Sequence, residues 1–236
     1  MKRRYTCVLI DADNTLLDFD ATEAQALRRT MERRGLPYNE ETRARYMAIN
    51  RALWDAFHRG EVEQEWLKGE RFRRFGAELG WSGDAGAWDA EYLDAMGDCG
   101  ALLPGAVELL QALKPYCRIG LATNGLKTVQ RRRLTGNPIT AYLDGVFISQ
   151  EMGVGKPHKA YFEQVLTALN ASPEETVMVG DDLLSDIQGA INAGLDSIWY
   201  SRNGGFSPLP TYTVADLGDV AKIVLGRENE IDEEKR

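Results

Sequence analysis

The sequence predicts an α/β protein, a doubly wound parallel sheet with helices on both faces and an all-helical domain inserted near its start. From Leu102 onward, short apolar runs alternate with helical patterns, which is typical of a parallel sheet covered on both faces. Residues from about 20 to 97 have helical periodicity and almost no β-branched runs. The opening strand has no place in a helical bundle, so we expect it to join the sheet. Residues 1–17 and 101–236 then form a discontinuous core, and 18–100 a helical cap domain.

Composition indicates a soluble globular protein that acts on small molecules. The 236 residues are 44% hydrophobic and 27% charged, enough for a sizeable core. A net charge of −8 disfavours nucleic-acid binding, and no apolar run approaches the roughly 18 residues of a membrane span. Three widely spaced cysteines indicate thiols in a reducing cytosol, and two distant histidines disfavour a histidine-based metal site. We therefore expect a cytoplasmic protein with neither nucleic acid nor membrane as partner.

The first predicted strand is the apolar run 6–10, and two acids follow it. Asp11 and Asp13 stand one residue apart, and a turn beginning at Ala12 would bring both carboxylates to one point. Two acids so close repel each other unless a cation or a shared proton relieves them. The alternative is an Asp-rich turn in which the acids only cap backbone groups.

The remaining elements follow from hydrophobic periodicity and from breaks at glycine and proline. In the cap, helical patterns cover about 24–31, 40–58, 63–79 and 87–96, and most of their aromatic residues are expected to be core. In the core we expect strands at 118–123, 145–149, 176–180, 197–200 and 212–214. Helices are expected at 106–113, 127–134, 159–169, 184–193 and near Val220. The highly charged tail 226–236 is expected to fray.

Polar residues follow four of the predicted strands, at the edge where parallel α/β sheets bind ligands. They are Asp11 and Asp13, then Thr123-Asn124-Gly125, Lys156-Pro157, and Gly180-Asp181-Asp182 with Asp186. Acids without histidine or thiolate suit Mg²⁺, and a hydroxyl, backbone N–H groups and a lysine suit a phosphoryl group. Alone, each group could be a turn, a solvated lysine or a helix cap. Their order predicts a site for a Mg²⁺-bound phosphate ester.

This ordered pattern resembles the haloacid dehalogenase-like (HAD) hydrolase superfamily over the whole chain. Asp11-x-Asp13-x-Thr15-Leu16 resembles its first motif, and the three groups that follow resemble its second, third and fourth. The resemblance implies a Rossmann-like core with a mobile cap. A helical insertion after the first motif is similar to the cap of the phosphatase-rich branch.

The resemblance also implies roles for the acids. Asp11 would be the nucleophile, forming an aspartyl-phosphate, and Asp13 the general acid and then the base. Asp13 favours phosphatase over dehalogenase chemistry, because a halide needs no proton on leaving. Mg²⁺ would be held by Asp11, the backbone carbonyl of Asp13 and Asp181, with Asp186 acting through water and Asp182 as the alternative second acid.

The other motif residues are implied to bind the phosphoryl group. Thr123, the Asn124 N–H, Gly125 and Lys156 would hold its oxygens and offset their charge in the transition state. Phosphoryl transfer requires little from a protein beyond positioning and electrostatics, which agrees with a site poor in other reactive groups.

The cap resembles that of bacterial HAD pyrimidine 5′-nucleotidases, in Tyr46-x-x-x-Asn50-x-x-Leu53-Trp54 and in Gly60-Glu61. We therefore expect a nucleoside monophosphate substrate. Asn50 and Trp54, one helical turn apart, are expected to face the active site and contact the nucleoside. The alternative is that Trp54 belongs to the cap core. Pro157-His158-Lys159 departs from the family pattern, in which an acid or Asn before Pro is more usual.

Two other classes of function remain open at this point. One is a phosphoglycolate or sugar-phosphate phosphatase, or a phosphosugar mutase, on the same scaffold. The other is a phosphate-binding regulatory module without turnover, against which the intact acids and Lys156 argue. We expect a monomer or a small homo-oligomer.

Overall fold

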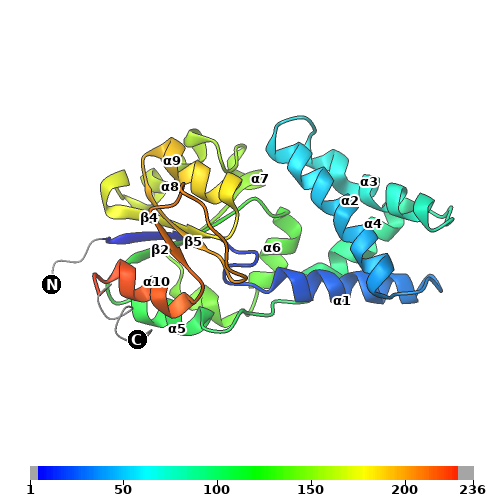
Figure 1. Cartoon of the computed structure of the whole chain (residues 1–236), viewed down its shortest axis with the longest axis horizontal. Coiled ribbons are helices and arrows are strands. Elements are labelled where there is room, and N and C mark those ends of the chain that lie inside the picture. The colour runs from blue at the N-terminus through cyan, green and yellow to red at the C-terminus, as the bar shows by residue number, and fades with distance from the viewer. Residues whose placement is uncertain (1–4, 228–236) are drawn as a thin grey trace. The chain divides into compact units, whose positions relative to one another are not determined.

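A computed structural model describes residues 5–227, and its centre is a parallel six-stranded sheet (Figure 1). The strand order is β3-β2-β1-β4-β5-β6. The strands are β1 (Cys7–Ile10), β2 (Arg118–Thr123), β3 (Gly145–Ile148), β4 (Thr176–Gly180), β5 (Asp196–Tyr200) and β6 (Tyr212–Val214). The predicted parallel α/β fold is confirmed.

Strand β1 lies at the point where the strand order reverses. Ile10 pairs with Leu121 of β2 on one side and with Val179 of β4 on the other. The chain builds outward from β1 through β2 to β3, and then returns to the opposite side of β1 with β4. All four residues of β1 are buried, as expected for a central strand with covered faces. In such sheets the carboxyl ends beside the reversal point form the ligand crevice.

Helices cover both faces of the sheet (Figure 1). On one face, α5 (Ala106–Leu113) and α10 (Leu217–Val224) bury their apolar sides against Val8 and Ile10. On the other face, α8 (Lys159–Leu169) and α9 (Gly189–Ala193) pack against Cys7 and Leu9. Alternate residues of β1 thus feed two separate hydrophobic clusters, which makes the sheet doubly wound.

The core differs from the sequence prediction mainly in short elements. Four were not predicted as such: η1 (Pro138–Tyr142), α7 (Ser149–Met152), η2 (Pro173–Glu175) and the π-helical turn η3 (Leu183–Gln188). The predicted helix 184–193 is therefore η3 followed by α9, and residue 149 opens α7 instead of ending β3. Segments of three to six residues are too short for a hydrophobic period to identify. Between β2 and β3, α6 spans Lys127–Leu134.

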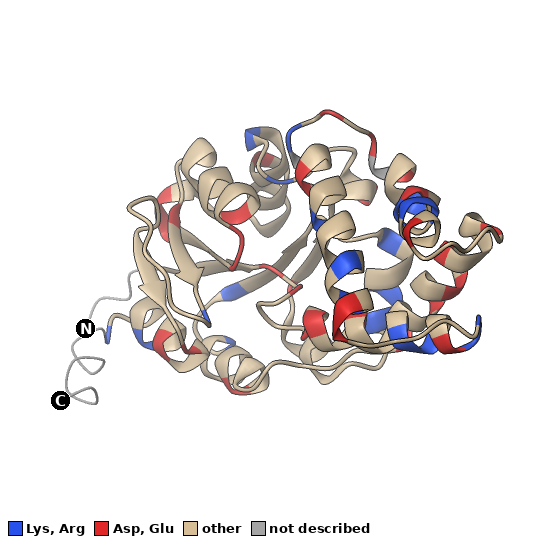
Figure 2. Cartoon of the chain, turned by 45° about the vertical axis from the view of Figure 1, so that its right-hand side comes forward, with Lys and Arg blue, Asp and Glu red and all other residues tan. Residues whose placement is uncertain are grey.

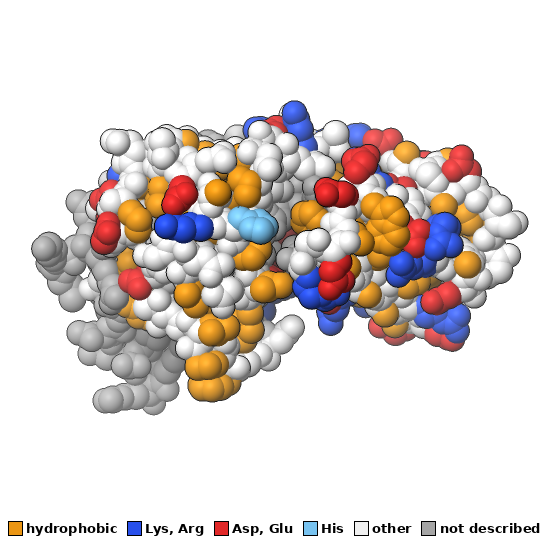
Figure 3. All heavy atoms as spheres, turned by 90° about the horizontal axis from the view of Figure 1, so that it is seen from above, with side chains coloured by type: hydrophobic (Ala, Val, Ile, Leu, Met, Phe, Trp, Pro, Cys, Tyr) orange, Lys and Arg blue, Asp and Glu red, His pale blue; other side chains and the backbone are white. Residues whose placement is uncertain are grey.

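The chain divides into two compact units, one of Met1–Phe19 with Gly100–Arg236 and one of Asp20–Cys99. The sequence places these boundaries at 17/18 and 100/101. The second unit contains most of α1 (Phe19–Glu32), with α2 (Glu40–His58), α3 (Gln64–Glu78) and α4 (Ala85–Gly97). Basic and acidic positions intersperse along these helices (Figure 2). Figure 3 shows one face of the molecule, where charged and polar side chains interrupt the apolar patches.

The core of the helical unit is aromatic, as predicted. Tyr46, Phe72 and Trp88 are each fully buried, and Phe72 stacks on both of the others. The sequence predicted one continuous helix over this segment, which is wrong. Helix α3 is broken after its first turn, because Gly69 has a φ of 76°. Only glycine adopts that conformation at low cost, so the residue explains the kink.

A polar network is buried within this helical unit. Arg71 on α3 donates to Asp89 on α4 at 2.7 Å, and both side chains are about 5% exposed or less. Glu23 on α1 accepts hydrogen bonds from Asn50 Nδ2 at 2.7 Å and from the Tyr92 hydroxyl at 3.3 Å. These hydrogen bonds connect all four helices of the unit.

Three smaller expectations have separate outcomes. Cys7 and Cys117 are buried cysteines outside any disulfide among the described residues, as predicted. Among the described residues, no helix is long and apolar enough to cross a membrane. The expected fraying of the tail concerns residues that lie largely outside the described range, which ends at 227.

Candidate active site

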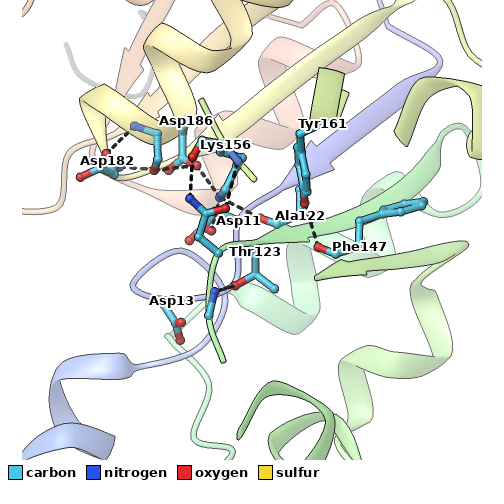
Figure 4. A network of polar contacts seen from close by, with 12 residues as sticks. Asp11, Asp13, Ala122, Thr123, Phe147, Lys156, Tyr161, Asp182 and Asp186 are labelled. Atoms are coloured by element: carbon cyan, nitrogen blue, oxygen red, sulfur yellow. Dashed lines mark hydrogen bonds and ion pairs between the residues drawn. The ribbon is translucent and has the colours of Figure 1, made fainter. Parts of the chain in front are cut away.

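The motif residues of the core come together at the carboxyl ends of β1, β2 and β4 (Figure 4). Asp11 follows β1 directly, and its backbone N–H donates to Val179 O of β4 at 2.9 Å. This hydrogen bond continues the pairing with β4 one residue past β1, and it fixes the backbone position of Asp11. Asp11 is buried, 7% exposed.

A tight turn after Asp11 presents Asp13. The Ala12 carbonyl accepts from the N–H groups of Leu16 and Leu17, and Asn14 N–H donates back to Leu17 O at 2.8 Å. Asn14 has a φ of 59°, which asparagine tolerates better than most residues. Ala12 points into the core, fully buried, so the turn that the sequence suggested at this residue brings Asp11 and Asp13 to the same end of the sheet.

Lys156 links the first and fourth motifs. Its ammonium donates to Asp11 Oδ1 at 2.6 Å, to Asp186 Oδ1 at 2.6 Å and to Ala122 O at 2.8 Å. Lys156 is 3% exposed. Burial alone would lower its pKa, but the carboxylates of Asp11 and Asp186 outweigh burial and raise it, so the lysine is charged.

The β4 end supplies three acids with different tasks. Asp182 caps η3, since its carboxylate accepts from Leu184 N at 3.0 Å and Ser185 N at 2.6 Å. Asp186 is fully buried, and its carboxylate accepts from Asp182 N at 3.1 Å and from Lys156 Nζ at 2.6 Å. A Cβ on Gly180 would lie 2.2 Å from Asp186 Oδ2, so only glycine leaves room for this carboxylate.

Asp11, Asp181 and Asp186 form a cluster that fits a hard cation. Each offers a carboxylate oxygen, and these oxygens lie within 4.8 Å of one another. Burial raises the pKa of Asp11, against the opposing effect of Lys156. Burial and the neighbouring acids, Asp186 first, raise the pKa of Asp181 to about 8. Crowded acids of this kind favour a divalent cation, and an all-oxygen donor set suits Mg²⁺.

The second motif holds both its own loop and the lysine loop. Thr123 Oγ1 accepts from Gly125 N at 3.0 Å. The Asn124 side chain pairs with the backbone of Lys156, accepting from its N–H at 2.9 Å and donating to its carbonyl at 2.7 Å. The sequence pointed only to the Asn124 backbone N–H, whereas the structure also gives its amide a positioning contact.

Two residues near Asp13 were not predicted as functional. Arg133 Nη1 pairs with Asp13 Oδ1, and Gln130 Nε2 donates to Asp13 Oδ2 at 2.6 Å. Both lie on α6 and both are buried. The available signal in the sequence was two polar residues three positions apart, which places them on the same side of the predicted helix after the second motif.

The two predicted cap residues lie on α2 of the helical unit. Asn50 is 6% exposed and donates to Glu23. Trp54 is half-buried, and its ring meets Phe57 edge-on at 5.7 Å. Their contact with a nucleoside stays a prediction.

The fold and this arrangement define a hydrolase. The profile of the haloacid dehalogenase-like hydrolases matches residues 5–194, and the chain belongs to this family. The family resemblance stated from the motifs is thereby confirmed.

Particular relatives share nearly the full length of the chain. Pyrimidine 5′-nucleotidase PynA of Streptococcus pneumoniae is 33% identical over 92% of this chain and 93% of its own. Pyrimidine 5′-nucleotidase YjjG of Escherichia coli is 32% identical over 94% of this chain and 98% of its own. A crystal structure of YfnB from Bacillus subtilis, described as bound to magnesium and as revealing interdomain movement, has a TM-score of 0.89. It is 32% identical and covers 94% of this chain and 99% of that one.

Proposed function

We propose that this protein is a Mg²⁺-dependent phosphomonoester hydrolase that acts through an aspartyl-phosphate on pyrimidine nucleoside 5′-monophosphates. The observation that carries the proposal is the Lys156 ammonium, held at 2.6 Å from both Asp11 and Asp186 at the carboxyl end of the sheet. It places a cation and a cluster of acids around one buried carboxylate, with a second carboxylate, Asp13, beside it. In-line phosphoryl transfer requires positive charge and well-placed carboxylates of this kind.

In the first step, an Asp11 oxygen attacks phosphorus and the ester P–O bond breaks. Asp13 gives its proton to the leaving oxygen, so that an alcohol departs and Asp11 carries the phosphoryl group. In the second step, Asp13 takes a proton from water as the water oxygen attacks phosphorus. The Asp11–phosphorus bond breaks, phosphate leaves, and both acids return to their starting states.

Asp11, Asp181 and Asp186, with the Asp13 backbone carbonyl, would hold the metal ion, Asp186 acting through water. Bound Mg²⁺ supplies positive charge that neutralises and orients phosphoryl oxygens. Because Asp182 caps η3 with its carboxylate, Asp186 is the better candidate for the second acid of this site. A bound dication would also lower the raised pKa values of the cluster and favour an ionised Asp11.

Thr123, Lys156 and the backbone N–H groups of the β2 loop would hold the phosphoryl oxygens. The Thr123 hydroxyl lies at the end of β2, and Asn124 keeps the lysine loop in place through two hydrogen bonds to Lys156. These groups are fixed before substrate arrives, so little reorganisation is needed as charge develops in the transition state.

The nucleotide preference rests on the relatives and on the cap. PynA and YjjG are pyrimidine 5′-nucleotidases that match the chain over cap and core alike. An amide and an indole, Asn50 and Trp54, suit hydrogen bonding and stacking to a base. A Trp54→Ala enzyme should lose its preference for nucleotides over simple phosphate esters. If it keeps that preference and is only less stable, Trp54 is cap core instead.

The main test is phosphate release with Mg²⁺ from a panel of nucleoside monophosphates, phosphoglycolate and sugar phosphates. We expect the highest kcat/KM for pyrimidine nucleotides and no turnover by Asp11→Asn. Preference for a phosphosugar would favour the alternative substrate class. A wild-type protein that binds phosphate but hydrolyses none of the esters would identify a regulatory module.

A further inference from the structure

Helix α6 directs two buried polar side chains at Asp13. Gln130 and Arg133 stand one helical turn apart, 117 and 120 residues from Asp13 in the sequence. Arg133 is 3% exposed and Gln130 1% exposed. Burying a guanidinium is costly unless an acid pairs with it. Arg133 pairs with Asp13, the acid assigned to proton transfer.

Gln130 also joins Asp13 to the second motif. Its Nε2 donates to Asp13 Oδ2 at 2.6 Å and lies 3.2 Å from Thr123 Oγ1. The buried Gln130 Oε1 has no hydrogen-bond partner among the described residues. Turning the amide round would place Oε1 against the Asp13 carboxylate, where two hydrogen-bond acceptors would repel each other. The contact with Asp13 therefore fixes the orientation of the amide.

Gly125 provides the space for this arrangement. A Cβ at Gly125 would lie 2.2 Å from Gln130 Nε2 and 2.9 Å from its Cγ and Cδ. Neither distance is tolerable, so any larger residue would displace the Gln130 side chain. Glycine is therefore required at this position of the second motif not only for backbone approach to phosphate. It also leaves room for the Gln130 amide that reaches Asp13.

We propose that Gln130 and Arg133 are positioning residues that orient the Asp13 carboxylate for proton transfer and fix its place relative to Thr123. This inference rests on the proposed function. Each Asp13 oxygen accepts one hydrogen bond from α6 and keeps a second lone pair. A proton can therefore pass between Asp13 and the leaving oxygen, or between water and Asp13, while both contacts remain.

The test compares two leaving groups in the same enzyme. A nitrophenolate leaves without much help from an acid, whereas the alkoxide of a nucleoside 5′-phosphate requires protonation. Because kcat/KM covers the steps up to release of the leaving group, loss of acid orientation should act selectively on the nucleotide. For Arg133→Met we expect kcat/KM to fall about 100-fold with UMP, within the range that general acid–base catalysis contributes, and less than about 5-fold with p-nitrophenyl phosphate.

A second readout reports the base step. If Asp13 is misoriented, hydrolysis of the phosphoenzyme slows for every substrate, so Arg133→Met should release a stoichiometric burst of nitrophenol before a slow steady state. Gln130→Met should show the same pattern to a smaller degree, and Arg133→Lys, which keeps a cation, should recover part of the loss. Arg131→Met, an exposed arginine two positions earlier on α6 that pairs with Glu151, is the matched control and should leave both substrates unchanged.

Asp13→Asn supplies the reference. Arg133→Met should add little to it in a double mutant, since both changes remove the same function. Equal losses with both substrates, or independent losses in the double mutant, would overturn the positioning role. If Arg133→Met does not fold, Gln130→Met decides by the same ratio. Failure of the proposed function is distinct: the wild-type protein would then release no phosphate from either ester.

Discussion

Removing the buried carboxyl of Glu23 should change how the stability of the helical unit depends on pH. Glu23 is 4% exposed, and burial raises its pKa from 4.5 to about 7, although Arg71 and the hydrogen bonds from Tyr92 and Asn50 oppose this. The folded state therefore keeps a proton on Glu23 at pH values where the unfolded chain has lost it. Stability from this group is complete below pH 4.5 and falls as the pH rises toward 7.

The size of the effect follows from the shift. At about 1.4 kcal/mol per pKa unit, a rise from 4.5 to about 7 corresponds to about 3 kcal/mol, most of it lost between pH 5 and pH 8. The assay is urea unfolding of wild type and Glu23→Gln at half-unit steps across that range. Glutamine keeps the shape and does not titrate, so the wild type should lose roughly 2 kcal/mol relative to the variant between pH 5 and pH 8.

Glu32→Gln is the matched control, because Glu32 lies on the same helix with its side chain 56% exposed. Its free energy of unfolding relative to wild type should stay constant with pH. A constant difference for Glu23→Gln would refute the reasoning, since it would mean that the folded and unfolded states hold the Glu23 proton equally.

Three further predictions concern other contacts. Gly125→Ala should displace Gln130 and lower kcat with nucleotides about 10-fold or more with an unchanged unfolding midpoint; an unchanged kcat would argue against the close approach. Arg71→Met should lower the free energy of unfolding by about 3–5 kcal/mol, because it leaves Asp89 buried without its cation, and Arg71→Met with Asp89→Leu should recover much of it in the same denaturation assay. Mg²⁺ should raise the melting temperature of the wild type and have less effect on Asp181→Asn, measured by calorimetry; equal shifts would place the ion elsewhere.

Local sequence pattern was sufficient for the long elements. The apolar period and the break at Gly60 predict α2 at about 40–58, as observed, and the near-continuous apolar runs predict the bounds of β2 and β4. The helix buries one apolar stripe over several turns, and the strands bury both faces over several residues. The hydrophobic pattern therefore repeats often enough to identify them. Turns of three to six residues, such as η1 and η3, have no such repeat. Their first turns are held by local side-chain caps, Asn137 on Ile139 N and Asp182 on Leu184 N, which a hydrophobic period does not record.

The order of polar residues after the strands was likewise sufficient to bring the core of the site together. Once the sheet is parallel, strand ends share one edge, so Asp11, Thr123 and Asp181 must meet there. Asp182 and Asp186 are acids on the same short segment, and only the structure shows that Asp182 caps η3 whereas Asp186 pairs with Lys156.

The sequence by itself therefore determined the family, the parallel sheet with a helical insertion, and the acids and lysine at the strand ends. Tertiary structure alone decided which side chains hold these groups in place: Asn124 on the Lys156 backbone, and Gln130 and Arg133 on Asp13. The physical reason is that periodicity records only whether a position is buried. Which partner a buried polar group meets depends on contacts between segments far apart in the sequence, here 32 to 120 residues, and these exist only once the chain has folded.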